Sequence, residues 1–243
     1  VLGVIGLTLY MLTPEATGYF ALVKTTLLAL IPLVIVVGFL IRIDRWEPEP
    51  WKTKISVFLW GAGVATLSAG ILNTALHHNI AYSTGDAQGA SALSATFVAP
   101  LVEETLKGVV VLIVVLVRRT SINSVLDGVV YAGFSAAGFM FTEDILYFLR
   151  GEAEGTTNLI VLVVMRGIFS PFLHVMATSM TGIGLALALL KFKRGWSKAG
   201  IVAVFWVCAM GIHFLWNGSA SYGGGWFLIL YAVVQVPAFI VWS

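Results

Sequence analysis

Residues 98–117 read VAPLVEETLKGVVVLIVVLV, an apolar run that contains Glu103, Glu104 and Lys107. A helix needs about 20 mostly apolar residues to cross the hydrocarbon core of a bilayer, and this run has that length. A charged side chain at the centre of a membrane costs roughly 2.5–3.5 kcal/mol on insertion scales. The run therefore predicts a membrane-embedded helix, and the cost of its charged residues marks them as functional candidates.

The composition of the chain agrees with a membrane protein. Of the 243 residues, 59% are hydrophobic and 11% are charged, whereas soluble domains are about 25% charged. The net charge of +2 and the lack of a tract rich in Lys, Arg and aromatic residues argue against nucleic-acid binding. The single cysteine, Cys208, excludes an internal disulfide framework. We therefore expect a protein whose main partner is the lipid bilayer.

Apolar segments of this kind recur along the whole chain. They lie near residues 1–12, 21–41, 55–76, 98–117, 128–149, 159–190, 199–217 and 225–243. We predict an all-α, polytopic transmembrane helical bundle of about eight spans, folded as a single domain over residues 1–243. The chain begins without Met, so we expect segment 1–12 to be the remnant of a longer first span.

Segment 159–190 is too long for one crossing. The dipeptide Ser170–Pro171 is expected to interrupt it, because proline lacks a backbone N–H and disfavours helix in the preceding residue. Residues 171–190 then form a span of ordinary length. We predict that the segment near 159–171 is broken or re-entrant, lying along the outer interface or dipping in and returning.

The distribution of Lys and Arg predicts the orientation. Connectors on one side hold ten of these residues, and the alternate connectors 13–20, 73–97, 150–158 and 218–224 hold only Arg150. The ten are Arg42, Arg45, Lys52, Lys54, Arg118, Arg119, Lys191, Lys193, Arg194 and Lys198. Because basic residues favour the cytoplasmic side, we place both termini in the cytoplasm and the protein in the plasma membrane.

Titratable residues of four spans share a predicted depth. Glu103 and Glu104 lie four to six residues below the outer start of their span, and Glu143 and His213 lie similarly below the outer ends of theirs. His174 lies about one turn below the outer end of residues 171–190. The sequence therefore predicts one polar layer in the outer half of the membrane, within a catalytic core near residues 98–217.

Two kinds of chemistry suit these residues. A carboxylate beside an imidazole can activate water as a general base, and two histidines with a glutamate can hold Zn²⁺ with an open water position. Glu103 and Glu104 point about 100° apart on a helix, so only one of them faces a given site. We expect Glu103 to face it and Lys107 or neighbouring helices to hold Glu104.

Each candidate also has a purely structural interpretation. The Glu104–Lys107 pair could simply lock two helices together, and Glu143 with Asp144 could be solvated charges at a helix end. Asn217 could stabilise an oxyanion beside His213 or could cap its helix. His77 and His78 are interpreted as interfacial, outside the site.

Several common hydrolase mechanisms are disfavoured. No serine stands in a G-x-S-x-G context, no H-E-x-x-H motif occurs, and Cys208 lies in an apolar span. Serine, cysteine and familiar zincin mechanisms therefore do not fit the sequence.

At its polar residues the chain resembles the PrsW family of intramembrane proteases. The motifs are EETLK (103–107), FMFTE (139–143), HVMAT (174–178) and HFLWN (213–217), in this order and in separate spans. The connector RIDRWEPEPW (42–51) and the run DGVVYAGFSAAGF (127–139) resemble the same family. That family is similar to the CAAX prenyl proteases and bacteriocin-processing enzymes, often described as glutamate-type intramembrane proteases.

The resemblance implies roles for these residues. Glu103 with a histidine would activate water, and His213 with Asn217 would stabilise the tetrahedral oxyanion. CAAX proteases carry F-x-x-x-H where this chain has Phe139 and Glu143, so the histidine that partners Glu103 would be His174. Glu143 would be either a second acid/base or a metal ligand, and Glu104 and Arg166 would support these groups. The second glutamate also makes Glu143, His174 and His213 a candidate Zn²⁺ site, the alternative being an enzyme without a metal.

The family is known for site-1 cleavage of membrane-bound anti-sigma factors. The resemblance therefore implies an endopeptidase that cuts a single-pass membrane protein near the extracytoplasmic face. Two alternatives stay open: a proton- or cation-coupled transporter that uses the same residues as a relay, and a non-catalytic membrane scaffold in which they join helices. The lack of an internal repeat argues against a transporter.

Overall fold

The computed structural model describes residues 18–222 and the isolated positions Ile229, Val233 and Val236. The described helices are α2 (Tyr19–Asp44), α3 (Trp51–Leu59), η1 (Trp60–Ala65), α4 (Thr66–Thr84), α5 (Ala87–Leu93), η2 (Ser94–Val98), α6 (Ala99–Val117), α7 (Val125–Glu154), α8 (Thr156–Val164), η3 (Met165–Phe169), α9 (Leu173–Leu190) and α10 (Gly195–Tyr222). The η segments are π-helical turns. No strand occurs among these residues, so the all-α class is confirmed.

Five described helices are long and apolar enough to cross a membrane. They are Tyr19–Asp44, Trp51–Thr84, Val125–Glu154, Thr156–Leu190 and Gly195–Ser219. Helix α6 has a suitable length of 19 residues but carries three charged residues near its start. The predicted segments 1–12 and 225–243 lie outside the described residues, apart from three isolated positions. The predicted count of about eight spans is therefore not confirmed.

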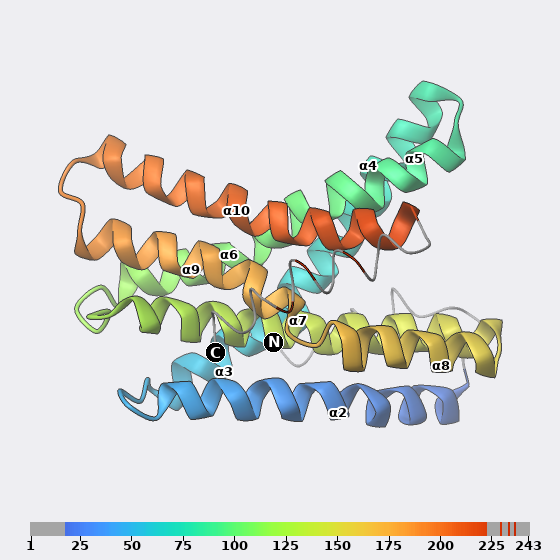
Figure 1. Ribbon diagram of the computed structural model, residues 1–243, viewed down its shortest axis with the longest axis horizontal. Helices are drawn as coiled ribbons and strands as arrows, with labels where there is room; N and C mark the ends of the chain where they lie inside the picture. Colours follow the sequence, from blue (N-terminus) through green and yellow to red (C-terminus); the bar gives the residue numbers. More distant parts are fainter. Residues whose placement is uncertain (1–17, 223–228, 230–232, 234–235, 237–243) are drawn as a thin grey trace.

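Successive rods of the bundle run in alternating directions. Figure 1 shows α2, the α3–α4 rod, the α5–α6 rod, α7, the α8–α9 rod and α10 arranged in this way. The connectors after α2, α6 and α9 lie together at the left end of Figure 1. They contain or border the ten basic residues that the sequence analysis places on one side, and we call this end of the molecule the basic end.

The chain breaks between α8 and α9 where the sequence predicts it. Ser170 has φ −127° and ψ 24°, and the α-helix resumes at Leu173. The segment neither dips in and returns nor lies apart from the bundle, because α8 lies alongside α7 and α9 continues along the same rod (Figure 1). Gly151 permits this packing: a Cβ there would lie 2.7 Å from the Leu162 side chain.

Helix α7 is the centre of the bundle and contacts α2, α3, α6, α8 and α9. It begins with a capping box, in which Ser124 accepts from the Asp127 N–H and the Asp127 carboxylate accepts from the Ser124 N–H. Small residues let neighbouring backbones approach closely, as is common between membrane helices. A Cβ on Gly138 would lie 2.0 Å from the Phe58 carbonyl oxygen.

Glycines Gly128 and Gly182 form the contact between α7 and α9. A Cβ on Gly182 would lie 2.2 Å from the Gly128 carbonyl oxygen and 2.8 Å from the Ala132 Cβ. We expect Gly182→Ala to destabilise the protein by about 1–3 kcal/mol, the usual cost of overpacking, and to lower the thermal midpoint in detergent. Gly211→Ala is the control, because a Cβ there meets nothing within 4 Å. Equal midpoints for both variants would contradict this packing.

Candidate active site

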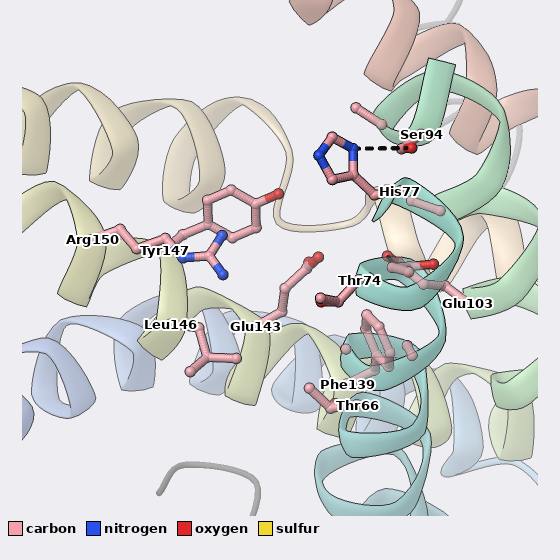
Figure 2. Close-up of a pocket in the computed structure, with 15 residues that line it drawn as sticks. Thr66, Thr74, His77, Ser94, Glu103, Phe139, Glu143, Leu146, Tyr147 and Arg150 are labelled. Atoms are coloured by element: carbon pink, nitrogen blue, oxygen red, sulfur yellow. Dashed lines mark hydrogen bonds between the residues drawn. The ribbon is translucent and has the colours of Figure 1, made fainter. Parts of the chain in front are cut away.

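Four helices bring the predicted site residues to one place. Helix α6 supplies Glu103 and Glu104, α7 supplies Glu143, α9 supplies His174 and α10 supplies His213. The Glu103, Glu104 and histidine side chains are buried, and the Glu143 side chain is 15% exposed. Figure 2 shows the carboxyl groups of Glu103 and Glu143 entering one cavity from opposite sides. The predicted convergence is therefore present in the structure.

The four helices also place these groups at one height. Each group lies about four to five helical turns, or about 21–27 Å, from the basic end of its rod. The distance to the other end is larger than the one or so turns that the sequence predicts. It is about two and a half to five turns, because α7, α10 and the α5–α6 and α8–α9 rods extend further. His174 in particular lies near the middle of Thr156–Leu190.

Glu104 is the buried hub of the cluster. Its Oε1 accepts a hydrogen bond from Lys107 Nζ at 2.5 Å and lies 2.9 Å from His213 Nδ1. Its Oε2 accepts a hydrogen bond from the Thr178 hydroxyl at 2.8 Å. The two oxygens of Glu104 therefore hold side chains from three helices in place. This is the division between the adjacent glutamates that their 100° separation predicts.

The contact with Glu104 fixes the tautomer of His213. An ionised carboxylate only accepts hydrogen bonds, so the proton of a neutral His213 ring lies on Nδ1. The other nitrogen, Nε2, then presents its lone pair 3.9 Å from Glu103 Oε2. A carboxylate that orients an imidazole in this way is typical of metal-binding and catalytic histidines.

Glu103 has one oxygen without a hydrogen-bond partner. Its Oε1 accepts a weak hydrogen bond from Asn73 Nδ2 at 3.3 Å, whereas Oε2 is buried with none among the described residues. A buried polar atom is rarely left in this state. The free oxygen therefore marks a place for a water molecule, a metal ion or a substrate atom.

Asn73 is a site residue that the sequence analysis missed. That analysis placed residue 73 at the start of an outer connector. In the structure α4 continues to Thr84, so Asn73 lies within this helix and its side chain contacts Glu103. The available signal was the pair Asn73 and His77, which share a helical face at i, i+4. His77, predicted to be interfacial, lines the same cavity and lies 3.5 Å from the Ser94 hydroxyl.

Glu143 and Asp144 are held by one guanidinium group. Arg166 donates to Glu143 Oε2 through Nη2 and to Asp144 Oδ1 through Nε, the latter at 2.5 Å. Its guanidinium also lies 4.2 Å from the Tyr147 ring centroid. The alternative that these carboxylates are solvated helix-end charges is wrong, because α7 continues to Glu154 and Asp144 is fully buried.

His174 has a partner at each ring nitrogen. Nε2 lies 3.0 Å from Glu143 Oε2, and Nδ1 lies 3.1 Å from Lys107 Nζ. The ring also stands at 89° to the His213 ring, with centroids 4.9 Å apart. His174 thus joins the Glu104–Lys107 pair to the Glu143–Arg166 pair in one network.

Asn217 lines the cavity near His213, and its Nδ2 donates to the Ala95 carbonyl oxygen at 2.9 Å. The alternative that it caps its helix is wrong, since α10 continues to Tyr222. Asn217 therefore ties α10 to η2 at the edge of the site.

Two adjoining cavities open onto these residues. One, of about 300 Å³, extends between α4 and α7 towards Arg150, and the other, of about 260 Å³, lies between α7, η3, α9 and α10. Both are lined by Glu103, Glu143, Tyr147, Ala95 and Ala99. The two glutamates therefore stand where the cavities meet.

The residues of the site fit a metal ion. Glu103, His174 and His213 each offer a ligand atom, and these atoms lie within 4.8 Å of one another. The unpartnered Glu103 oxygen is a second sign, and two imidazoles with one carboxylate suit Zn²⁺ with an open position. The sequence analysis proposed Glu143 in place of Glu103, but Arg166 holds Glu143 beside this triad.

Comparisons with known proteins point to a family of membrane proteases. Residues 49–242 match the family described as PrsW family intramembrane metalloprotease. The Protease PrsW of Clostridioides difficile (strain 630) is 29% identical over 173 residues, which cover 71% of this chain and 68% of that protein. No solved structure matches the chain.

Proposed function

Because the chain belongs to the PrsW family of intramembrane metalloproteases, we propose that it hydrolyses a peptide bond of a single-pass membrane protein near the extracytoplasmic face. The observation that carries this proposal is the buried, unpartnered Oε2 of Glu103 facing His213 Nε2 at the junction of two cavities. Anti-sigma factors are the substrate class that the family resemblance implies.

The depth of the site supports the position of the cut. If the basic end faces the cytoplasm, the site lies about 21–27 Å into a hydrocarbon core about 30 Å thick. With that orientation, the site would lie in the outer half of the bilayer. A bond in the outer, juxtamembrane part of a crossing segment would lie at this height, and we propose that such a bond is cleaved.

Glu103, His174 and His213 would hold the metal ion, with Glu104 orienting His213. When bound, a Zn²⁺ ion would polarise the substrate carbonyl and make a water molecule more acidic. Both nitrogens of His174 have hydrogen-bond partners in the structure, so ligation through either one would replace such a contact.

Glu143 would then be the general base. With Glu103 committed to the ion, Glu143 is the other carboxylate that lines both cavities. Arg166 keeps it in place and balances its charge. We propose that Glu143 takes the proton of the attacking water and passes it to the leaving nitrogen, and that Asn217 donates to the oxyanion through its amide.

The family match disfavours the transporter and scaffold alternatives. Membership in a peptidase family makes the protein a membrane peptidase, and no described feature favours transport.

Co-reconstitution with a library of single-pass reporters tests the proposal. The library carries one transmembrane segment with a randomised outer juxtamembrane stretch, and the new termini of the products are sequenced. We expect cuts clustered near the outer membrane boundary. Failure of the protein to cut any reporter, or cuts clustered at the inner boundary, would refute the proposal.

A further inference from the structure

Arg150 departs from the charge pattern of the chain. It is the one Lys or Arg in the connectors predicted to face outward, although basic residues are disfavoured on that side. The structure places it on α7, exposed and lining the cavity that contains Glu103 and Glu143. Figure 2 shows its guanidinium directed along the cavity towards Glu143. This basic residue is therefore part of the site.

No carboxylate neutralises Arg150 within the part of the chain that the structure describes. The nearby carboxylates form ion pairs with other basic residues. Arg166 pairs with Glu143 and Asp144, and Lys24 pairs with Glu152. The guanidinium lies 5.8 Å from the Tyr147 ring centroid, a long cation–π contact. A planar cation in this position suits an acidic group that enters the cavity.

Arg150 lies on the same face of α7 as Glu143, at a distance that a short peptide can span. Glu143, Tyr147 and Arg150 follow one another at i, i+4 and i+7, so they line one face of α7. The separation of Glu143 and Arg150 along the axis is about 10 Å, which an extended peptide covers in about three residues. Arg150 lies on the side of Glu143 away from the basic end.

The opposite wall of the cavity leaves room for a peptide backbone. Ala69 and Gly70 of α4, Ala95 of η2 and Ala99 of α6 line it, and their side chains are small. Asn73, Thr74 and Ser94 line the same cavity with groups that can bond to a main chain. An extended segment could therefore lie between this wall and the Arg150 face.

We propose that Arg150 forms a subsite for an acidic substrate side chain, two to four residues on the outer side of the cleaved bond. This inference rests on the proposed function and specifies its substrate class. Substrates are then single-pass proteins with Asp or Glu in the outer juxtamembrane segment, beyond the cleavage site.

The reporter library tests this subsite through charge reversal. For the wild-type protein, we expect Asp and Glu to be enriched about fivefold over Lys and Arg at these positions, as for a partly exposed ion pair of good geometry. Arg150→Glu should reverse the preference, and Arg150→Lys should keep it in part. Arg119→Glu is the matched control at the basic end and should leave the preference unchanged.

Two outcomes separate this inference from the proposed function. Cleavage with the same residue preference in the wild type and in Arg150→Glu would overturn the subsite and leave the protease intact. If the wild type cuts no reporter, the proposed function fails. Crosslinking of the uncut reporters to the protein then tests whether Arg150 binds acidic side chains. Preferential capture of acidic reporters that is lost in Arg150→Glu supports the subsite, and capture without charge preference overturns it.

Discussion

Glu103→Gln is expected to remove the bound metal and to lower cleavage of a membrane reporter by at least about 10³-fold, within the range for loss of a group central to water activation. The substitution keeps the size of the side chain and its bond with Asn73, but the neutral amide is a poor metal ligand. The measurement is the initial cleavage rate in proteoliposomes together with the metal content of the purified protein.

Asn73→Ala is the control for this variant. It removes the neighbour of Glu103 Oε1 and leaves the ligand atoms in place. We expect a loss of metal affinity of about 10- to 100-fold, as for other residues that orient a ligand, with activity restored at high metal concentration. A Glu103→Gln protein with full metal content and the wild-type rate would show that Glu103 has neither role.

Glu143→Gln is expected to lower the cleavage rate by about 10²–10⁴-fold, the usual contribution of a general base, while metal content stays at the wild-type level. Glu143 lies outside the triad that would hold the ion but lines both cavities. Substrate binding should change little, because Arg150, the proposed subsite for an acidic substrate side chain, remains. Reporter capture measured beside the cleavage rate separates these two effects.

Asp144→Asn is the matched control, because it weakens the second ion pair of Arg166, the one with Asp144, and leaves Glu143 unchanged. Its cleavage rate should stay much closer to the wild type than that of Glu143→Gln. Equal losses in the two variants would mean that the Arg166 ion pairs, rather than a proton transfer, explain the effect.

The sequence predicted the features that depend on local patterns. Apolar run lengths predicted the α-helices, and the dipeptide Ser170–Pro171 predicted the break before α9, because proline acts on its own backbone and that of its neighbour. Placing the titratable residues on the predicted spans also indicated a common layer. The 100° step between Glu103 and Glu104 predicted that the two side chains would have different surroundings, and the expected pairing of Glu104 with Lys107 is present.

Other features depend on contacts between distant segments. The sequence predicted outer helix ends too close to the site, because hydropathy does not show that polar turns such as those around Asn73 stay helical. The proposed choice of Glu103 over Glu143 as a metal ligand rests on Arg166. This residue lies 23 residues after Glu143 and reaches it because the α8–α9 rod packs against α7. The interpretations of Glu143 as a solvated charge and of Asn217 as a cap failed because α7 and α10 continue past these residues, to Glu154 and Tyr222.

Removal and return of the metal tests the central claim most directly. Protein treated with a chelator and reconstituted in metal-free vesicles should cut no reporter, and one equivalent of Zn²⁺ should restore cleavage in the wild type but not in a His213→Ala variant. Full cleavage by wild-type protein shown to contain no metal would contradict the assignment of Glu103, His174 and His213 as its ligands.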